Sequence, residues 1–218
     1  MKKGILILVL VALVATGAFA QMFSFGGGAL FDASFLNGVY LRGFGERFYI
    51  GEQILAPGIF MFFDAMFVEA ELGVTYGMHT LVTNITEAGK VETESFGAAL
   101  ALGFSVLGKY PFAVSSNIAL FPLLGASYNL VLLGITGELS ESDANVVELS
   151  QFGLLAGLGA DFNLTESIFF RAEAMFHFRF PSKFWRDIGR DFDYEEGIRA
   201  DNTFGMGPRV KVGIGYRF

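Results

Sequence analysis

Long stretches of this chain alternate strictly between large apolar residues and small or charged ones, with the charges confined to one side. In segment 209–218 the large apolar residues fall on one face, and Arg209, Lys211 and Arg217 fall on the other. Segment 168–178 alternates in the same way. A period of two belongs to β-strands, and a helix would mix the two sets. The chain is therefore predicted to be all-β.

The composition indicates which face points outward. The chain has 218 residues, of which 53% are hydrophobic, with 28 glycines, 26 phenylalanines and a mean hydropathy of +0.51. A soluble barrel would turn its charged face outward, but that face is too rich in glycine to coat a soluble surface. A membrane barrel turns the apolar face to lipid. We expect a transmembrane β-barrel; a soluble lipocalin-like carrier, with the faces exchanged, is the alternative.

The first twenty residues are predicted to be a cleaved secretory signal peptide. A basic start (Lys2, Lys3), an apolar run over 5–14 and the A-x-A sequence at 18–20 fit this pattern. The apolar run is shorter than the roughly 20 residues of a membrane-spanning helix, which disfavours an uncleaved anchor. Removing 1–20 leaves 21–218 as one domain, an outer-membrane barrel with 13 basic and 22 acidic side chains.

Eight strands are expected, an even number as single-chain bacterial barrels have. They span residues 22–31, 58–64, 66–77, 95–112, 118–133, 149–162, 168–180 and 203–218. Long polar segments at 32–57, 78–94, 134–148 and 181–202 alternate with short turns. Long loops at the cell surface and short turns in the periplasm would place both termini in the periplasm. The predicted fold is a closed antiparallel eight-stranded transmembrane β-barrel with up-and-down topology.

One stretch could instead hold a membrane-spanning helix. No charge occurs between Lys109 and Glu138. Pro122, Gly125 and Asn129 interrupt this run, and no other segment after residue 20 offers a comparable span. A lone helix would leave the alternating segments unexplained, so strands are the preferred interpretation.

Eight charged residues are predicted to line the lumen and form ion pairs. They are Glu69, Glu71, Asp161, Arg171, Glu173, Arg209, Lys211 and Arg217, four of each sign. If the last two strands are antiparallel, Glu173 and Lys211 face each other. Asp64 is expected in a turn, Lys109 near the periplasmic end and Arg179 near the outer rim. Because eight strands enclose only enough space for side chains, a wide pore is not expected; a narrow conduit for small or apolar molecules is the alternative.

The pattern indicates no enzyme and no cofactor. His177 has no serine within two residues, and His79 has no carboxylate nearer in sequence than Glu71 and Glu87, so both are interpreted as non-catalytic. No metal-ligand spacing or phosphate-binding loop is present in the sequence. The acidic balance argues against nucleic acid as a partner, and the absence of cysteine excludes a disulfide framework.

The long segment 181–202 combines aromatic and arginine side chains, the residue types that dominate binding hot spots. Two interpretations stay open: an interfacial belt or self-packed loop, and contact with an extracellular ligand or host surface as the partner. The candidate interaction residues are Phe184, Trp185, Arg186, Arg190, Phe192 and Tyr194.

The end of the chain resembles the assembly signal of bacterial outer-membrane barrels, with Tyr216 and a terminal Phe218 in an alternating strand. FPLLGASYNL (121–130) and KYPF (109–112) resemble stretches common in the small eight-stranded group that includes OmpX, OmpW and the membrane domain of OmpA. The resemblance implies insertion into outer-membrane lipid by the barrel-assembly machinery. It implies no single activity, because the group covers adhesion, structural support and passage of small apolar molecules.

Overall fold

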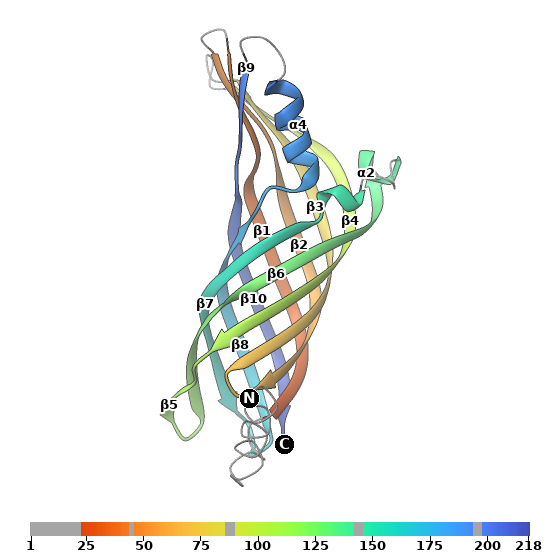
Figure 1. Cartoon of the computed structure of the whole chain (residues 1–218). Helices are drawn as coiled ribbons and strands as arrows, with labels where there is room; N and C mark the ends of the chain where they lie inside the picture. Colours follow the sequence, from red (N-terminus) through yellow and green to blue (C-terminus); the bar gives the residue numbers. More distant parts are fainter. Residues whose placement is uncertain (1–22, 44–45, 86–89, 142–145, 194–197) are drawn as a thin grey trace, which may run out of the picture.

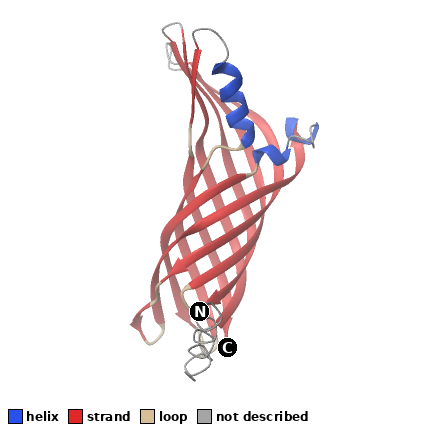
Figure 2. Cartoon of the chain, in the orientation of Figure 1, coloured by secondary structure: helices blue, strands red, loops and turns tan. Residues whose placement is uncertain are grey.

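The computed structural model describes residues 23–43, 46–85, 90–141, 146–193 and 198–218, so the predicted signal peptide lies outside the described residues. The strands are β1 (Phe23–Gly43), β2 (Glu46–Ala65), β3 (Val68–Ile85), β4 (Lys90–Lys109), β5 (Phe112–Ser115), β6 (Ile118–Gly137), β7 (Gln151–Asn163), β8 (Ile168–Arg179), β9 (Ile198–Asn202) and β10 (Gly205–Arg217). The helices are α2 (Glu138–Glu141), the 3-10 turn η2 (Val147–Leu149) and α4 (Lys183–Asp193). Figures 1 and 2 show a barrel with these helices at one end.

The barrel is closed because the first strand pairs with the last. β1 pairs with β2 along one edge and with β10 along the other, from Ser24–Arg217 to Phe35–Met206. Every pairing is antiparallel, as predicted. Ten strands occur among the described residues rather than eight. The ring itself has the eight expected members, and the two short strands β5 and β9 pair alongside β6 and β1.

Two of the predicted long loops were wrong. Most of 32–57 belongs to the β1–β2 hairpin, and most of 78–94 extends β3 and β4. A β-bulge between Ser34 and Asn37 shifts the residues that face inward by one position, which breaks the period of two that the sequence analysis relied on. The charge-free stretch is also strand: residues 112–115 form β5 and residues 118–137 form β6. Among the described residues, no helix is long and apolar enough to cross a membrane.

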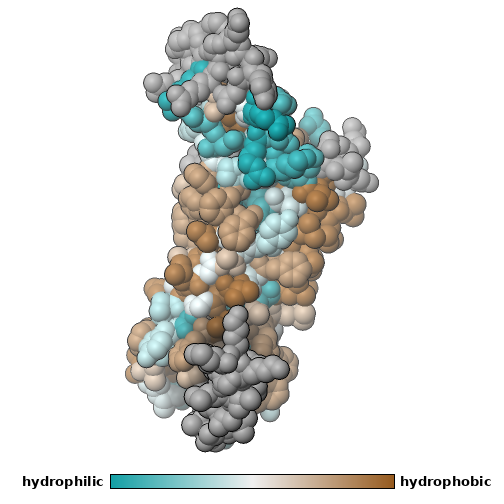
Figure 3. All heavy atoms as spheres, viewed as in Figure 1, coloured by the Kyte–Doolittle hydropathy of each residue, from teal (hydrophilic) through white to brown (hydrophobic). Residues whose placement is uncertain are grey.

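The apolar face points outward, as predicted for a membrane barrel. Along β10, Val210, Val212 and Ile214 are 44%, 43% and 59% exposed, whereas Arg209 and Lys211 are 3% and 1% exposed. Brown apolar atoms form a broad zone below the hydrophilic helix end in Figure 3. The outer surface of the barrel wall is therefore suited to lipid contact.

Aromatic side chains mark two levels on the outer wall. Where β1 begins and β10 ends, the Phe25 ring lies 6.1 Å from the Tyr216 ring and 5.6 Å from the Phe218 ring. At the helix end, Phe152, Phe178, Phe180 and Phe204 form a cluster of rings. The strand rise of about 3.4 Å and a tilt of about 40° place these levels about 25 Å apart along β8. This spacing matches the apolar band of a bacterial outer-membrane barrel.

Glycines leave room for phenylalanine rings that fill the lower lumen. Phe60, Phe62, Phe121 and Phe169 are at most 3% exposed. A Cβ atom at Gly159 would overlap the Phe121 ring, and one at Gly215 would overlap the Phe169 ring. At these lumen-facing glycines, an aromatic ring from a neighbouring strand thus fills the space that a side chain would otherwise occupy.

Replacing Gly159 by alanine is expected to lower the free energy of unfolding by about 1 to 3 kcal/mol, because the new methyl group collides with Phe121 in a filled lumen. Urea unfolding in detergent micelles, followed by Trp185 emission, measures this loss. Gly108→Ala is the control, since its Cβ would lie 3.5 Å from the nearest atom, at ordinary contact distance. Equal stability of the two variants would show that Gly159 is not needed for packing.

Candidate functional site in the barrel lumen

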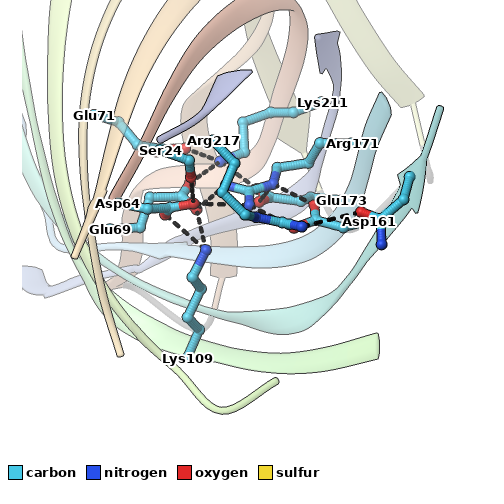
Figure 4. A network of polar contacts seen from close by, with 11 residues as sticks. Ser24, Asp64, Glu69, Glu71, Lys109, Asp161, Arg171, Glu173, Lys211 and Arg217 are labelled. Carbon is cyan, nitrogen blue, oxygen red and sulfur yellow. Dashed lines mark hydrogen bonds and ion pairs between the residues drawn. The ribbon is translucent and has the colours of Figure 1, made fainter. Parts of the chain in front are cut away.

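The lower lumen is filled by a charged cluster centred on Arg171, which projects inward from β8 (Figure 4). Its guanidinium nitrogens lie 2.6 Å from Glu69, 2.8 Å from Asp64 and 2.7 Å from Asp161. The Phe62 ring stacks on the same guanidinium, with its centroid 4.4 Å from Cζ. At 1% exposure, Arg171 joins β2, β3, β7 and β8 across the lumen.

Lys211 forms a second centre within this cluster. Its ammonium group contacts Glu71 and Glu173 and lies 3.4 Å from Glu69. Lys211 and Glu173 are direct partners in the β8–β10 register, as the parity argument predicted. These three glutamates also form the group of buried carboxylates closest to a metal-ligand arrangement among the described residues. Because Lys211 already supplies the cation between them, we assign them to the ion-pair network.

Three further basic residues complete the cluster. Lys109 Nζ lies 2.6 Å from Asp64, and Arg217 lies 3.5 Å from Asp161. Arg209 lies 3.4 Å from Glu71. We call this cluster the arginine tier; it consists of Asp64, Glu69, Glu71, Lys109, Asp161, Arg171, Glu173, Arg209, Lys211 and Arg217, five acids and five bases. The structure brings together all eight residues predicted for the lumen and adds two more.

Asp64 corrects the sequence analysis, which expected it in a turn. It is the penultimate residue of β2 and is only 3% exposed. Ser24 donates a hydrogen bond to it at 2.7 Å, in addition to its ion pairs with Lys109 and Arg171. Beside a tight turn, the alternation of residues along a strand does not show whether a charged side chain points into the lumen or away from it. For this reason the alternation did not place Asp64 inside the barrel.

Above the arginine tier lies a second group, the histidine tier: Asp32, Ser127, His177 and Arg179. His177 Nε2 lies 2.8 Å from Ser127 Oγ, and Nδ1 lies 3.0 Å from Asp32. Arg179 lies 2.9 Å from Asp32, and Arg209 links the two tiers at 4.0 Å from the same carboxylate. Ser127 and Asp32 were not among the sequence candidates, because neither β6 nor β1 is a neighbour of β8 in the sheet, and the three side chains meet only across the lumen.

The order Ser127–His177–Asp32 has the connectivity of a nucleophilic triad. Its surroundings do not suit that chemistry. The two guanidinium groups beside Asp32 oppose the imidazolium that such a mechanism must form, and the three side chains are at most 3% exposed. We therefore interpret the tier as a structural hydrogen-bond chain across the lumen.

The third group, the tryptophan tier, closes the mouth of the barrel and consists of Asn37, Glu52, His79 and Trp185. Glu52 is 1% exposed and accepts a hydrogen bond from Asn37 at 2.6 Å and one from Trp185 Nε1 at 3.1 Å. Its second oxygen lies 2.8 Å from His79 Nδ1. Every contact to this buried carboxylate comes from a different strand or helix, so the group fastens α4 to the barrel wall.

Trp185 was expected as an exposed binding residue, and this expectation was wrong. It is 1% exposed and packs with Val39 and Leu41 of β1, which are fully buried. Phe184 is half-buried between Trp185 and Phe96, with ring centroids 5.1 and 6.4 Å away. The reason is that residues 183–193 of this segment fold as helix α4 with one apolar face, which turns its largest side chain into the lumen.

The opposite face of α4 is charged and exposed. Lys183, Arg186 and Arg190 lie on it, as do two aspartates. Lys183 pairs with Glu148 at 2.5 Å, and its hydrogen bond to that carboxylate, together with the carboxylate's negative charge, raises the pKa of Lys183. Two further candidates, the side chain of Phe192 and the whole of Tyr194, lie outside the described residues.

The predicted assembly-signal residues lie on the lipid-facing wall at the end opposite α4. Tyr216 and Phe218 are 43% and 59% exposed, and their rings lie 5.5 Å apart. The backbone N–H of Phe218 donates to the carbonyl of Phe23 at 3.1 Å, which ties the last residue to the start of β1. This placement leaves both side chains accessible from outside the barrel.

Neither the protein-family models nor the curated proteins contain a match to this chain. Solved structures similar to it include OprG, an outer membrane protein of Pseudomonas aeruginosa, at 13% identity and a TM-score of 0.49, with 90% of this chain and 95% of that chain covered. They also include Ail, the attachment invasion locus protein of Yersinia pestis, at 13% identity and a TM-score of 0.37, with 90% and 97% covered. The N-terminal β-barrel domain of Pseudomonas aeruginosa OprF has 12% identity and a TM-score of 0.34, with 88% and 99% covered.

The protein's own geometry defines its class. A closed antiparallel barrel with an apolar outer band, aromatic levels about 25 Å apart and a charged lumen is an outer-membrane β-barrel protein. This is the small-barrel class that the end of the sequence resembles.

Proposed function

We propose that this protein is a non-enzymatic bacterial outer-membrane barrel with a closed lumen, which presents helix α4 to partners at the cell surface. One observation carries the proposal: Trp185 is buried in the barrel mouth while the charged face of the same helix is exposed. Side chains in the barrel mouth hold α4 in place, and the exposed face of the helix is available for contacts with partners. Two further tiers of buried polar contacts lie below it.

The distribution of connections supports an orientation with α4 outside the cell. The α4 end also carries the tall hairpins of β1–β2 and β3–β4, whereas β2–β3 and β7–β8 are joined by short turns at the other end. Long connections face the exterior and short turns face the periplasm in bacterial barrels. In this orientation Phe23 and Phe218 are periplasmic, and the barrel-assembly machinery meets Tyr216 and Phe218 from that side.

The exposed face of α4 favours an anionic partner. Lys183, Arg186 and Arg190 recur at helical spacing along one stripe, and Asp187 lies beside them, 3.7 Å from Lys183 and 3.2 Å from Arg190. Basic side chains on an exposed rim act mainly through attraction to opposite charge. Acidic polysaccharide of a matrix or host surface is the partner chemistry that fits this stripe.

Neutralising this stripe with Lys183→Gln, Arg186→Gln and Arg190→Gln is expected to weaken binding to an immobilised sulfated polysaccharide about tenfold at 0.15 M salt. The original protein and the neutralised variant are compared on the same polysaccharide surface, either in whole cells or in nanodiscs. The matched control is Lys183→Arg, Arg186→Lys and Arg190→Lys, which keeps all three charges and should bind like the original protein.

Deleting the whole segment 182–200 would not test this proposal cleanly, because the deletion also removes Trp185 from the barrel mouth. The neutralised variant leaves the buried face of α4 intact, so its Trp185 emission should not change. Unchanged polysaccharide binding together with unchanged emission would remove the surface-contact proposal.

A further inference from the structure

A small cavity remains in the upper lumen between the histidine tier and the tryptophan tier. Its volume is about 40 Å³, room for about three water molecules. Asp32 and Arg179 contribute to its wall from the histidine tier, and His79 contributes from the tryptophan tier. Leu149 of η2 lines it as well. The arginine tier fills the lumen further down, so the cavity does not continue toward the other end of the barrel.

The wall of this cavity has an apolar side built from short side chains. Ala56, Ala99 and Ala101 line it from β2 and β4, together with Gly77 of β3. Larger residues at these inward positions would fill the space, as the phenylalanines do lower in the barrel. The cavity therefore accommodates a short apolar group such as a methyl.

The other side of the wall is polar and contains a donor without a partner. Gln151 is 4% exposed, and its Nε2 has no hydrogen-bond partner among the described residues. Asn129, its direct partner in the β6–β7 register, lines the same cavity. A buried amide N–H without an acceptor is unfavourable, so an acceptor is expected in the cavity.

The charges on this wall compensate each other. Asp32 and Arg179 form an ion pair at 2.9 Å, and the Asp32 carboxylate also contacts His177. A charged guest would meet one partner of like sign and would lose its hydration. The cavity thus favours an uncharged molecule with a hydrogen-bond acceptor and a short apolar end.

We propose that this cavity is a binding site for a small uncharged carboxamide of about four non-hydrogen atoms. The carbonyl oxygen accepts from Gln151 Nε2, the amide N–H groups face Asn129 and Asp32, and the methyl group lies against Ala99 and Ala101. This role is independent of the surface contacts made by the outer face of α4.

Acetamide is the probe, and saturation-transfer NMR on the full chain in micelles is the measurement. The expected result is saturable binding in the millimolar range. Acetate, which carries a charge, and benzamide, which exceeds the cavity, should give no saturable signal. Ala101→Leu fills the cavity and should abolish binding, whereas Ala156→Leu, at an exposed outward position on β7, should leave it unchanged.

Gln151→Leu provides a second test that does not depend on filling the cavity, and it should weaken acetamide binding at least tenfold. The heat-dependent shift of the barrel band in SDS gels establishes that each variant is folded. No saturable signal in the original protein would mean that the cavity holds only water, and equal signals in the original protein and Ala101→Leu would mean non-specific contact. Either result overturns the proposal.

Discussion

Replacing Arg171 by leucine is expected to lower the free energy of unfolding by about 3 to 5 kcal/mol, the largest effect of any single charge in this barrel. The guanidinium serves Asp64, Glu69 and Asp161 at once, at distances of 2.6 to 2.8 Å and with 1% exposure. Leucine leaves these carboxylates in the lumen without their shared cation. Urea unfolding in micelles, followed by Trp185 emission, measures the loss.

Arg217→Gln is the matched control for this prediction. Its side chain is 25% exposed and lies 3.5 Å from a single carboxylate, that of Asp161, so the expected loss is below about 1 kcal/mol. A second control, Arg171→Leu combined with Asp161→Leu, should recover part of the stability because it removes one unpaired carboxylate. If Arg171→Leu and Arg217→Gln were equally stable, the arginine tier would not be what holds the lower lumen together.

Replacing Trp185 by alanine is expected to lower the free energy of unfolding by about 3 to 5 kcal/mol. The substitution empties the barrel mouth beside Val39 and Leu41 and takes a donor from the buried carboxylate of Glu52. This substitution removes the single tryptophan of the chain, so emission cannot report unfolding. The measurement is instead the temperature at which the folded band disappears in SDS gels. We expect this temperature to fall markedly.

Trp185→Phe separates packing from hydrogen bonding. Phenylalanine keeps most of the ring volume but lacks the N–H that Glu52 accepts, so the expected loss is about 1 to 3 kcal/mol. An alanine variant as stable as the original protein would show that α4 does not rest in the mouth. The tryptophan tier would then not close the barrel mouth.

The sequence predicts the ring of eight strands and eight of the charged lumen residues, because the membrane imposes a simple rule. A charge that faces lipid is strongly unfavourable, so charged side chains in the membrane-spanning strands must lie on the inward face. The structure places inside four such charges of β8 and β10: Arg171, Glu173, Arg209 and Lys211. The pairing of Glu173 with Lys211 follows from that parity together with antiparallel neighbours.

The same rule fails above the membrane, where the outer face is free to be polar. The bulge after Ser34 then moves the inward positions to Asn37, Val39 and Leu41, which are out of phase with the inward positions before it. The tryptophan tier was missed for this reason, since its members come from segments predicted to be loops. A helix that turns Trp185 inward can be recognised only once the mouth that receives it is known.

The central claim is that three tiers of side chains close the lumen, and planar-bilayer recording of the purified protein tests it most directly. The account predicts no steady openings, and none in Trp185→Ala, because the arginine tier stays in place when α4 is loosened. Steady openings of the original protein that change with Arg209 or Glu173 substitution would contradict it, and would make the lumen a narrow conduit.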